Sequence, residues 1–145
     1  MSAKRPTLPM TGGCLCGAIR YEISAFPLLL YTCNCTDCQT SSGSAFALNM
    51  PVATKSFRIL RGEPKGWRHK SPSGADVTSW FCGECGSALF SRDPNDPEQM
   101  SIRLGTFDGD PGIRPSTHSF VAYAARWEAI PDDGLPRHAE SAHTE

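Results

Sequence analysis

Apolar and polar residues alternate in several short stretches of the chain, and this alternation predicts β-strands. In residues 19–23 and 100–104 every second residue is apolar, and the residues between them are polar. A period of two is typical of a strand that buries one face. Shorter runs rich in aromatic and small residues are further strand candidates, namely 57–59, 78–81, 87–90 and 118–123. No stretch keeps the period of a helix over three turns, so the pattern predicts an all-β fold.

Turn-forming residues separate the predicted strands, and one short helix is predicted between two of them. The turns fall where Gly, Pro, Asp and Asn gather, at 64–66, 72–74, 93–97 and 108–112. The helix is expected to begin at Thr36, because Thr36 can cap the first turn while Gln39 reaches back to it, as in a capping box. We expect it to end by Gly43, after one or two turns.

Composition indicates one domain with a small aliphatic core. The chain has 145 residues, which suits a single domain. Leu, Ile, Val and Phe together supply only about 18% of the residues, and 13 Gly and 12 Pro make turns frequent. We expect the domain to span residues 11–137, with flexible tails at 1–10 and 138–145 that are polar and lack periodicity. A fold of this kind needs additional fastening.

Charge and hydropathy exclude several classes of partner. Fourteen basic and fifteen acidic residues leave a net charge of -1, which gives no electrostatic footprint for nucleic acid or a membrane surface. The start of the chain lacks the apolar segment of a secretory signal, and the longest strongly apolar run, 26–31, is far too short to span a bilayer. We therefore expect a cytoplasmic protein with no nucleic-acid partner and no membrane partner.

Seven cysteines are the candidate fastener. They all lie in close pairs: Cys14-x-Cys16, Cys33-x-Cys35, Cys35-x-x-Cys38 and Cys82-x-x-Cys85. An odd number cannot be used up by disulfides, and a reducing cytoplasm favours metal over disulfides. Thiolates two or three residues apart can bind one ion without distorting the chain, and tetrahedral zinc favours such ligands. Zinc is therefore the predicted cofactor, with redox or iron–sulfur chemistry as the alternative.

Spacing alone leaves two groupings of these cysteines open. A zinc-ribbon arrangement would join the pair 35/38 to the pair 82/85, and it would leave the other three cysteines unused. The second grouping uses all seven: one ion bound by Cys14, Cys16, Cys82 and Cys85, and another bound by Cys33, Cys35 and Cys38.

Five segments carry a resemblance to a known family: GGCLCGAIRYEI, CNCTDCQTSSGSAF, WFCGECGSALF, SIRLGTFDGDPGIRPSTH and RWEAIPDDGLP. They resemble the glutathione-dependent formaldehyde-activating enzyme family, which also includes centromere protein V. The resemblance runs from about Gly12 to Pro136, and all seven cysteine positions match it at once. It implies a β-tent of small antiparallel sheets held by zinc, with the short helix after the second Cys-x-Cys.

The resemblance also implies the second grouping and an activity. The four-ligand site would be structural, and Cys33, Cys35 and Cys38 would hold a second, open zinc. The implied activity is that of a carbon–sulfur lyase, which joins glutathione and formaldehyde reversibly as S-hydroxymethylglutathione. The chain carries Asn34 where the best-known members have His, and Gln39 and Thr40 where they have basic residues. Because Asn34 lies in the loop between Cys33 and Cys35, it is a candidate substrate contact, or it bonds its own backbone as Asn often does.

Elementary chemistry predicts different roles for the two sites, and therefore two zinc ions per chain. Four thiolates saturate zinc and leave it a poor Lewis acid, so that site is expected to fasten the fold. Three thiolates leave a position to which an incoming thiol can bind as a nucleophilic thiolate. We expect that thiolate, from glutathione or a similar compound, to add to a small aldehyde. The alternative is a zinc-stabilised interaction module without catalysis, in which His118 closes the second site.

Other polar residues have weaker functional predictions. His69, His138 and His143 lie in loop or tail contexts and are expected to be solvated. Asp132 and Asp133 are expected to form a turn. Three arginines are candidates for binding the carboxylates of glutathione: Arg92, Arg103 and Arg126.

Overall fold

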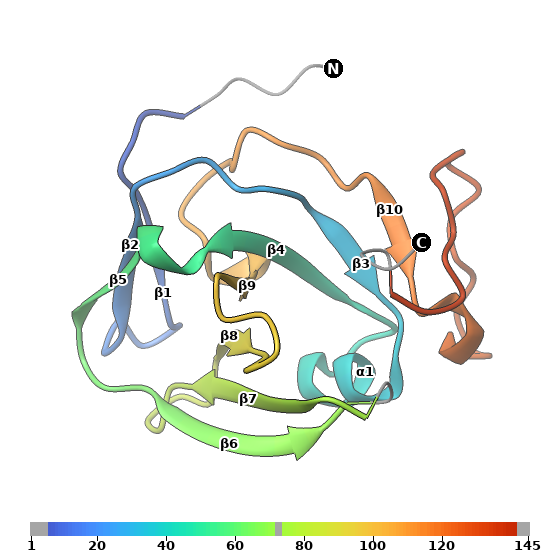
Figure 1. The fold of residues 1–145 in the computed structure, drawn as a ribbon, viewed down its shortest axis with the longest axis horizontal. Coiled ribbons are helices and arrows are strands. Elements are labelled where there is room, and N and C mark those ends of the chain that lie inside the picture. Colours follow the sequence, from blue (N-terminus) through green and yellow to red (C-terminus); the bar gives the residue numbers. More distant parts are fainter. Residues whose placement is uncertain (1–5, 72–73, 142–145) are drawn as a thin grey trace.

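The computed structural model describes residues 6–71 and 74–141, and its architecture is all-β with one short α-helix (Figure 1). The strands are β1 (Met10–Gly13), β2 (Arg20–Ile23), β3 (Tyr31–Cys33), β4 (Ala47–Ala53), β5 (Phe57–Arg61), β6 (Lys65–Lys70), β7 (Asp76–Phe81), β8 (Ala88–Arg92), β9 (Gln99–Arg103) and β10 (Thr117–Ser119). The helix α1 spans Thr36–Ser42, and short 3-10 turns follow at Thr54–Ser56, Leu104–Thr106 and Val121–Tyr123. The predicted fold class is confirmed.

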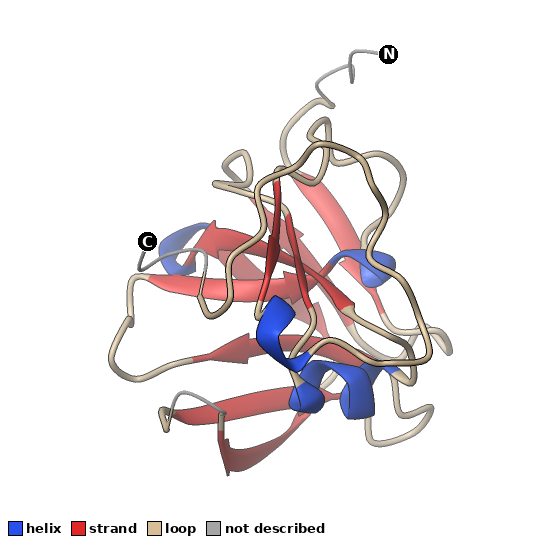
Figure 2. Ribbon diagram, turned by 90° about the vertical axis from the view of Figure 1, so that its right-hand side faces the viewer, coloured by secondary structure: helices blue, strands red, loops and turns tan. Residues whose placement is uncertain are grey.

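The strands form two sheets. The smaller sheet has the order β1-β2-β5, and the larger has the order β10-β3-β4-β9-β8-β7-β6. Neighbouring strands of both sheets are antiparallel except β10 and β3, which are parallel. Figure 2 turns the molecule by 90° and shows the helical segments, in blue, at several places around the strands. The two strands that flank α1 along the chain, β3 and β4, both belong to the larger sheet.

One hydrophobic cluster lies between the two sheets. Tyr21 and Ile23 of β2 enter it from the small sheet, and Met50 and Ile102 enter it from the large sheet; all four are fully buried. Because β2 and β9 alternate between buried and half-buried residues, each contributes one face to this core. Cys14 and Cys82 belong to the same cluster, so the core continues directly into a group of thiols.

The alternating stretches are the best-predicted elements. Residues 19–23 and 100–104 correspond to β2 and β9, and the three short runs in 57–90 correspond to β5, β7 and β8. The prediction for 118–123 is half right, because the strand ends at Ser119 and a 3-10 turn follows. Four strands were not predicted. Pro51 interrupts the pattern of β4, whereas β6 is exposed along most of its length and so lacks an apolar face.

The helix begins at Thr36 as predicted, but its N-cap lies one residue before the predicted cap. Its N-cap is Cys35, whose sulfur accepts a hydrogen bond from the backbone N–H of Cys38 at 3.3 Å. The predicted cap is wrong because a cysteine sulfur takes the place that Ser, Thr, Asp or Asn usually fills. Gln39 donates to the backbone oxygens of Asn34 and Tyr123 instead of reaching back to Thr36. The predicted end at Gly43 is confirmed, with a φ of 69°.

The paired part of the chain extends beyond the expected bounds of 11–137. Met10 is buried and begins β1, and the backbone of His138 and Glu140 bonds to residues 118–121. Residues 1–5 and 142–145 of the expected tails lie outside the described residues. Within the described ranges, no helix has the length and apolar character needed to cross a bilayer.

Candidate metal centres

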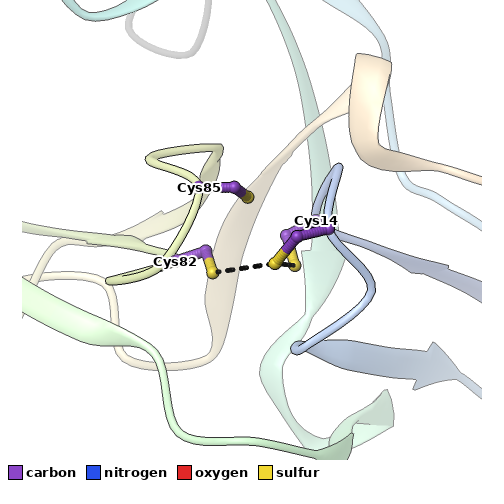
Figure 3. A group of neighbouring side chains, drawn as sticks. Cys14, Cys82 and Cys85 are labelled. Carbon is purple, nitrogen blue, oxygen red and sulfur yellow. Dashed lines mark hydrogen bonds between the residues drawn. The ribbon is translucent and has the colours of Figure 1, made fainter.

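Four cysteines from two distant loops meet at the edge of the core. We call Cys14, Cys16, Cys82 and Cys85 the four-cysteine cluster, and all its sulfurs lie within 4.8 Å of one another. The sulfur of Cys16 lies 3.6 Å from that of Cys14 and 3.8 Å from that of Cys82. Figure 3 shows the 82–85 loop facing the loop that carries Cys14, with the thiols directed toward a common centre. Zn–S bonds of about 2.3 Å in a tetrahedron place sulfurs about 3.8 Å apart, so the separations fit a metal ion.

Tight turns hold both halves of this cluster. The backbone N–H of Gly86 bonds to the carbonyl of Cys82, and Gly86 has a φ of 79°, which a side chain would strain. Backbone N–H groups also point at the sulfurs: Ile19 donates to Cys14 Sγ at 3.2 Å and Glu84 donates to Cys82 Sγ at 3.4 Å. Such donors stabilise negative charge on sulfur, which metal binding requires.

Ser87 joins the two loops and acts on one thiol. Its hydroxyl accepts a hydrogen bond from the backbone N–H of Leu15 and lies 3.2 Å from Cys85 Sγ. The Ser87 hydroxyl and backbone lower the pKa of the Cys85 thiol to about 5. Cys85 is therefore prepared as a thiolate at neutral pH.

The other three cysteines lie within six residues of one another, around the start of α1. Cys33 ends β3, Cys35 caps the helix and Cys38 lies in its first turn; we call them the three-cysteine cluster. All three are buried, and their sulfurs lie within 4.8 Å of one another. Cys33 Sγ donates to Cys35 Sγ at 3.4 Å. Among the described residues, no fourth His, Cys, Asp or Glu ligand atom comes within this distance of all three sulfurs.

Negative charge in the three-cysteine cluster gathers on Cys38. Hydrogen bonds from Cys33 and Cys35, together with the nearby Arg103 guanidinium, lower the pKa of Cys38 to about 3. The hydrogen bonds to Cys35 and Cys38, and burial, raise the pKa of Cys33. Asn49 also directs its amide at Cys38 Sγ from 3.9 Å. One anionic sulfur beside two thiols suits a site that takes up a cation and releases protons.

The three-cysteine cluster opens onto a cavity of about 610 Å³. The wall opposite α1 is the β6–β7 hairpin, and Figure 1 shows this hairpin running beneath the helix. Side chains of both signs reach the cavity, with Asp37 and Asp93 against Lys70 and Arg103. This volume lies in the range that binds small molecules.

Phe120 lines the same cavity and adopts an unusual backbone conformation. Its φ is 54°, and within the described ranges no other non-glycine residue has a positive φ. The left-handed region costs a residue with a Cβ about 1–2 kcal/mol. Phe120 packs against the three-cysteine cluster, so the strained turn places an aromatic wall beside the thiols. No pattern in the sequence signals this residue.

The structure separates the three arginines that were candidates for binding carboxylates. Arg103 lines the cavity and donates to Asn49 Oδ1 and Ser41 Oγ, and it has no carboxylate partner within 4.0 Å among the described residues. Arg92 lies over the ring of Trp80 instead, 5.8 Å from its centroid. Arg126 is exposed and does not line this cavity. Only Arg103 combines a free positive charge with access to the thiols.

Asn34 does not line the cavity of the three-cysteine cluster. It is buried, and its amide donates to Thr32 Oγ1 at 3.2 Å and to the backbone oxygen of Ser119 at 3.1 Å. It borders a separate cavity of only about 50 Å³. The structure therefore places Asn34 in the framework that fixes the loop between Cys33 and Cys35.

His118 bonds through both ring nitrogens, and so it is not a fourth ligand of the three-cysteine cluster. Nδ1 lies 2.8 Å from Thr32 Oγ1, and Nε2 lies 2.9 Å from Asp133 Oδ2. The bond with His118 lowers the pKa of Asp133, whose other oxygen accepts from the backbone N–H of Leu135. The expected turn role of Asp133 is confirmed, and it also anchors the C-terminal segment to β3 through His118.

The expectation that His69 is solvated is wrong. Its side chain is only 18% exposed and lines the cavity. The error follows from missing β6, since Trp67 and His69 lie two residues apart and so share one strand face. His138 bonds to His118 through its backbone, and His143 lies outside the described residues.

Comparisons with known proteins identify the family of this chain. A sequence model of the glutathione-dependent formaldehyde-activating enzyme family matches residues 9–123. A protein of Halomonas elongata named "Putative glutathione-dependent formaldehyde-activating enzyme" is 28% identical over 110 residues, which are 70% of this chain and 67% of that protein. The crystal structure of a Rhodobacter sphaeroides protein shares the fold, with a TM-score of 0.57 at 19% identity, covering 89% of this chain and 99% of the other. Since the family model spans most of the chain, this protein belongs to the glutathione-dependent formaldehyde-activating enzyme family.

Proposed function

We propose that this protein is a zinc-dependent carbon–sulfur lyase that joins a thiol, such as glutathione, and a small aldehyde reversibly. The observation that carries the proposal is the three-cysteine cluster, whose sulfurs open onto a cavity and have no fourth protein ligand among the described residues. Family membership supports glutathione and formaldehyde as the two substrates. The four-cysteine cluster is proposed to bind a second, structural zinc.

The donor sets of both clusters fit zinc. Thiolate sulfur is a preferred zinc ligand, and the separations of 3.4 to 3.8 Å between neighbouring sulfurs are close to the edge of a Zn–S tetrahedron. When bound to the three-cysteine cluster, zinc would lower the pKa of an incoming thiol and hold it as a thiolate.

The reaction balances without an external reagent. The S–H bond of the substrate breaks, its sulfur forms a bond with the carbonyl carbon, and the carbonyl oxygen receives the proton to become a hydroxyl. In the reverse direction the hydroxyl loses its proton, the carbon–sulfur bond breaks and the thiol is restored. The two substrates are proposed to meet in this cavity, where Phe120 and Trp67 give apolar walls and Arg103 offers positive charge.

Arg103 is proposed to bind a carboxylate of the thiol substrate. Its guanidinium lies at the cavity wall beside Cys38 and forms no ion pair with a carboxylate among the described residues. A charge-assisted hydrogen bond contributes about 1.5 kcal/mol, so Arg103→Gln is expected to raise the KM for glutathione about tenfold. Cysteamine, a thiol without a carboxylate, is the matched control, and its KM is expected to stay the same.

The proposed function is tested by removing one thiol of the three-cysteine cluster and comparing the variant with the wild-type protein. Cys35→Ser is expected to lower the rate of adduct formation from glutathione and formaldehyde at least about 100-fold while the circular dichroism spectrum is kept. The zinc content is expected to fall from two ions per chain to one. Two results together would support an interaction module instead: the wild-type protein does not accelerate the reaction, and removal of either of its two zinc ions unfolds the chain.

A further inference from the structure

Three polar side chains from the β6–β7 hairpin and α1 form a row on the cavity wall. Ser79 Oγ of β7 lies 3.0 Å from His69 Nε2 of β6. His69 Nδ1 lies 3.4 Å from Asp37 Oδ2, which belongs to α1. All three residues line the cavity of about 610 Å³. The row therefore runs from the hairpin to the helix turn that carries Cys38.

The donors and acceptors that these groups offer indicate which atom donates at each step of the row. Asp37 Oδ2 is buried and makes no hydrogen bond of ordinary geometry in the described chain, so it lacks a donor. A buried carboxylate oxygen without a donor is costly, and His69 Nδ1, which faces it at 3.4 Å, is the group placed to donate to it when the two draw closer. Nε2 of a neutral imidazole then accepts the hydroxyl proton of Ser79. Such bonds are often long before a substrate binds and shorten in the complex.

Trp67 fixes the plane of this imidazole. The two rings meet edge to face with their centroids 4.5 Å apart, and Trp67 is paired with Ser79 across the β6–β7 ladder. The His69 side chain is 18% exposed, whereas that of Asp37 is 38% exposed, so the centre of the row is more sheltered than its Asp37 end. A ring held in one orientation between an alcohol and a carboxylate is the arrangement of a general base that works through a hydroxyl.

We propose that Ser79, His69 and Asp37 form a proton relay that serves the addition of a thiol to an aldehyde in this cavity. The proposal rests on the proposed function and assigns residues that move the proton from sulfur to oxygen. Ser79 is the catalytic residue that contacts the substrate, while Asp37 is a positioning residue that acts through His69.

The relay is used twice in each addition. As the substrate S–H bond breaks, its proton passes to Ser79 Oγ while the original Ser79 proton moves to His69 Nε2. The resulting imidazolium is stabilised by the Asp37 carboxylate that faces it. When the carbon–sulfur bond has formed, the same proton returns through Ser79 to the new alkoxide, and His69 is neutral again. No proton is gained or lost overall, and the reverse reaction follows the same path.

The experiment measures exchange between free formaldehyde and its glutathione adduct by 13C exchange NMR, using the full-length zinc-loaded protein. Ser79→Ala and His69→Asn are expected to lower kcat about 100-fold with little change in KM, because a general acid–base contributes at least that factor. Ser79→Thr, which keeps the hydroxyl, is expected to retain most of the activity. Added imidazole is expected to restore turnover to His69→Asn but not to Ser79→Ala.

Asp37→Asn tests the positioning role, and His138→Asn is the matched control. Asp37→Asn is expected to lower kcat about tenfold, since the amide cannot stabilise the imidazolium, while zinc content and circular dichroism stay unchanged. His138→Asn removes a histidine that does not line the cavity and is expected to be silent.

The relay would be overturned if His69→Asn kept the wild-type kcat. It would also be overturned if the fall in kcat came with an equally large rise in KM and imidazole did not restore turnover. Either result would leave the lyase proposal intact. A wild-type protein without any effect on the exchange rate would overturn both.

Discussion

The two cysteine clusters use the same side chain in opposite surroundings. Cys16 and Cys82 of the four-cysteine cluster come from loops 66 residues apart, and the cluster borders the core between the two sheets. The three-cysteine cluster lies within one short stretch of chain and opens onto a cavity. A cross-link between distant loops removes much conformational freedom, whereas one within a few residues removes little. The four-cysteine cluster is therefore suited to stabilise the fold, and the three-cysteine cluster is suited to bind a substrate.

The largest expected effect is the loss of the four-cysteine cluster. Cys82 is 1% exposed and belongs to the core, so Cys82→Ser removes a metal ligand and leaves a buried hydroxyl. Structural zinc supplies about 10 kcal/mol of apparent binding free energy, which is comparable with the net stability of many domains. The variant is expected to be largely unfolded, as measured by circular dichroism and urea titration with the zinc content.

The matched control is Cys33→Ser, in the other cluster, which is expected to fold. The comparison fails if Cys82→Ser keeps the wild-type free energy of unfolding, or if both variants unfold to the same extent.

Metal removal is expected to separate the two clusters in a single titration. An open three-thiolate site lets a chelator reach its ion, whereas four protein ligands leave no position for attack. We expect a chelator to release one zinc ion first, with turnover lost in step and the circular dichroism spectrum unchanged. The second ion is expected to leave only together with unfolding. Zinc analysis and circular dichroism along the titration measure both steps, and simultaneous release of the two ions would remove the distinction.

A smaller effect is expected on the charge of the three-cysteine cluster. Cys33, Cys35 and Arg103 lower the pKa of Cys38 to about 3, so in the metal-free protein this thiolate is present above that pH and is lost as the pH falls through it. Any stability that comes from this lowered pKa is likewise lost on acidification. Arg103→Gln removes one of these causes and is expected to move the midpoint upward by about one pH unit.

Ultraviolet absorbance of the thiolate, recorded during acid titration of the metal-free protein, measures this midpoint. Arg92→Gln is the matched control, since Arg92 lies over Trp80 and outside the cavity. An unchanged midpoint in Arg103→Gln would show that the neighbouring thiols alone set the charge of Cys38.

Local patterns predicted the strands that bury one face, but not the partners that lie far apart in sequence. Tyr21 and Ile23 alternate with polar residues, so β2 could be predicted from five residues. In contrast, β6 has no buried face, and the position of His69 depends on its pairing with β7 and on α1 lying opposite. Spacing brought each cysteine pair together, because two or three residues fix that geometry. The grouping of the pairs depended on how the two sheets pack, which no local pattern contains.

The smallest effect concerns a single amide that ties the three-cysteine loop to the C-terminal segment. Gln39 Nε2 donates to the backbone oxygens of Asn34 and Tyr123, both at 2.9 Å. Gln39→Ala deletes both bonds and is expected to lower the free energy of unfolding by about 1 kcal/mol, partly offset by the higher helix propensity of Ala. Thr40→Ala, an exposed change on the same helix, is the control and is expected to stay within about 0.5 kcal/mol.

Urea denaturation of the zinc-loaded proteins measures both values. If Gln39→Ala is as stable as Thr40→Ala, the C-terminal segment does not support the loop. If Gln39→Ala loses about 1 kcal/mol and also releases zinc from the three-cysteine cluster more readily, then hydrogen bonds to distant backbone support this cluster. Its own ligands all lie within one short stretch of chain. The contrast between the clusters would then lie in the kind of long-range bond: metal–sulfur bonds in the four-cysteine cluster, and an amide in the three-cysteine cluster.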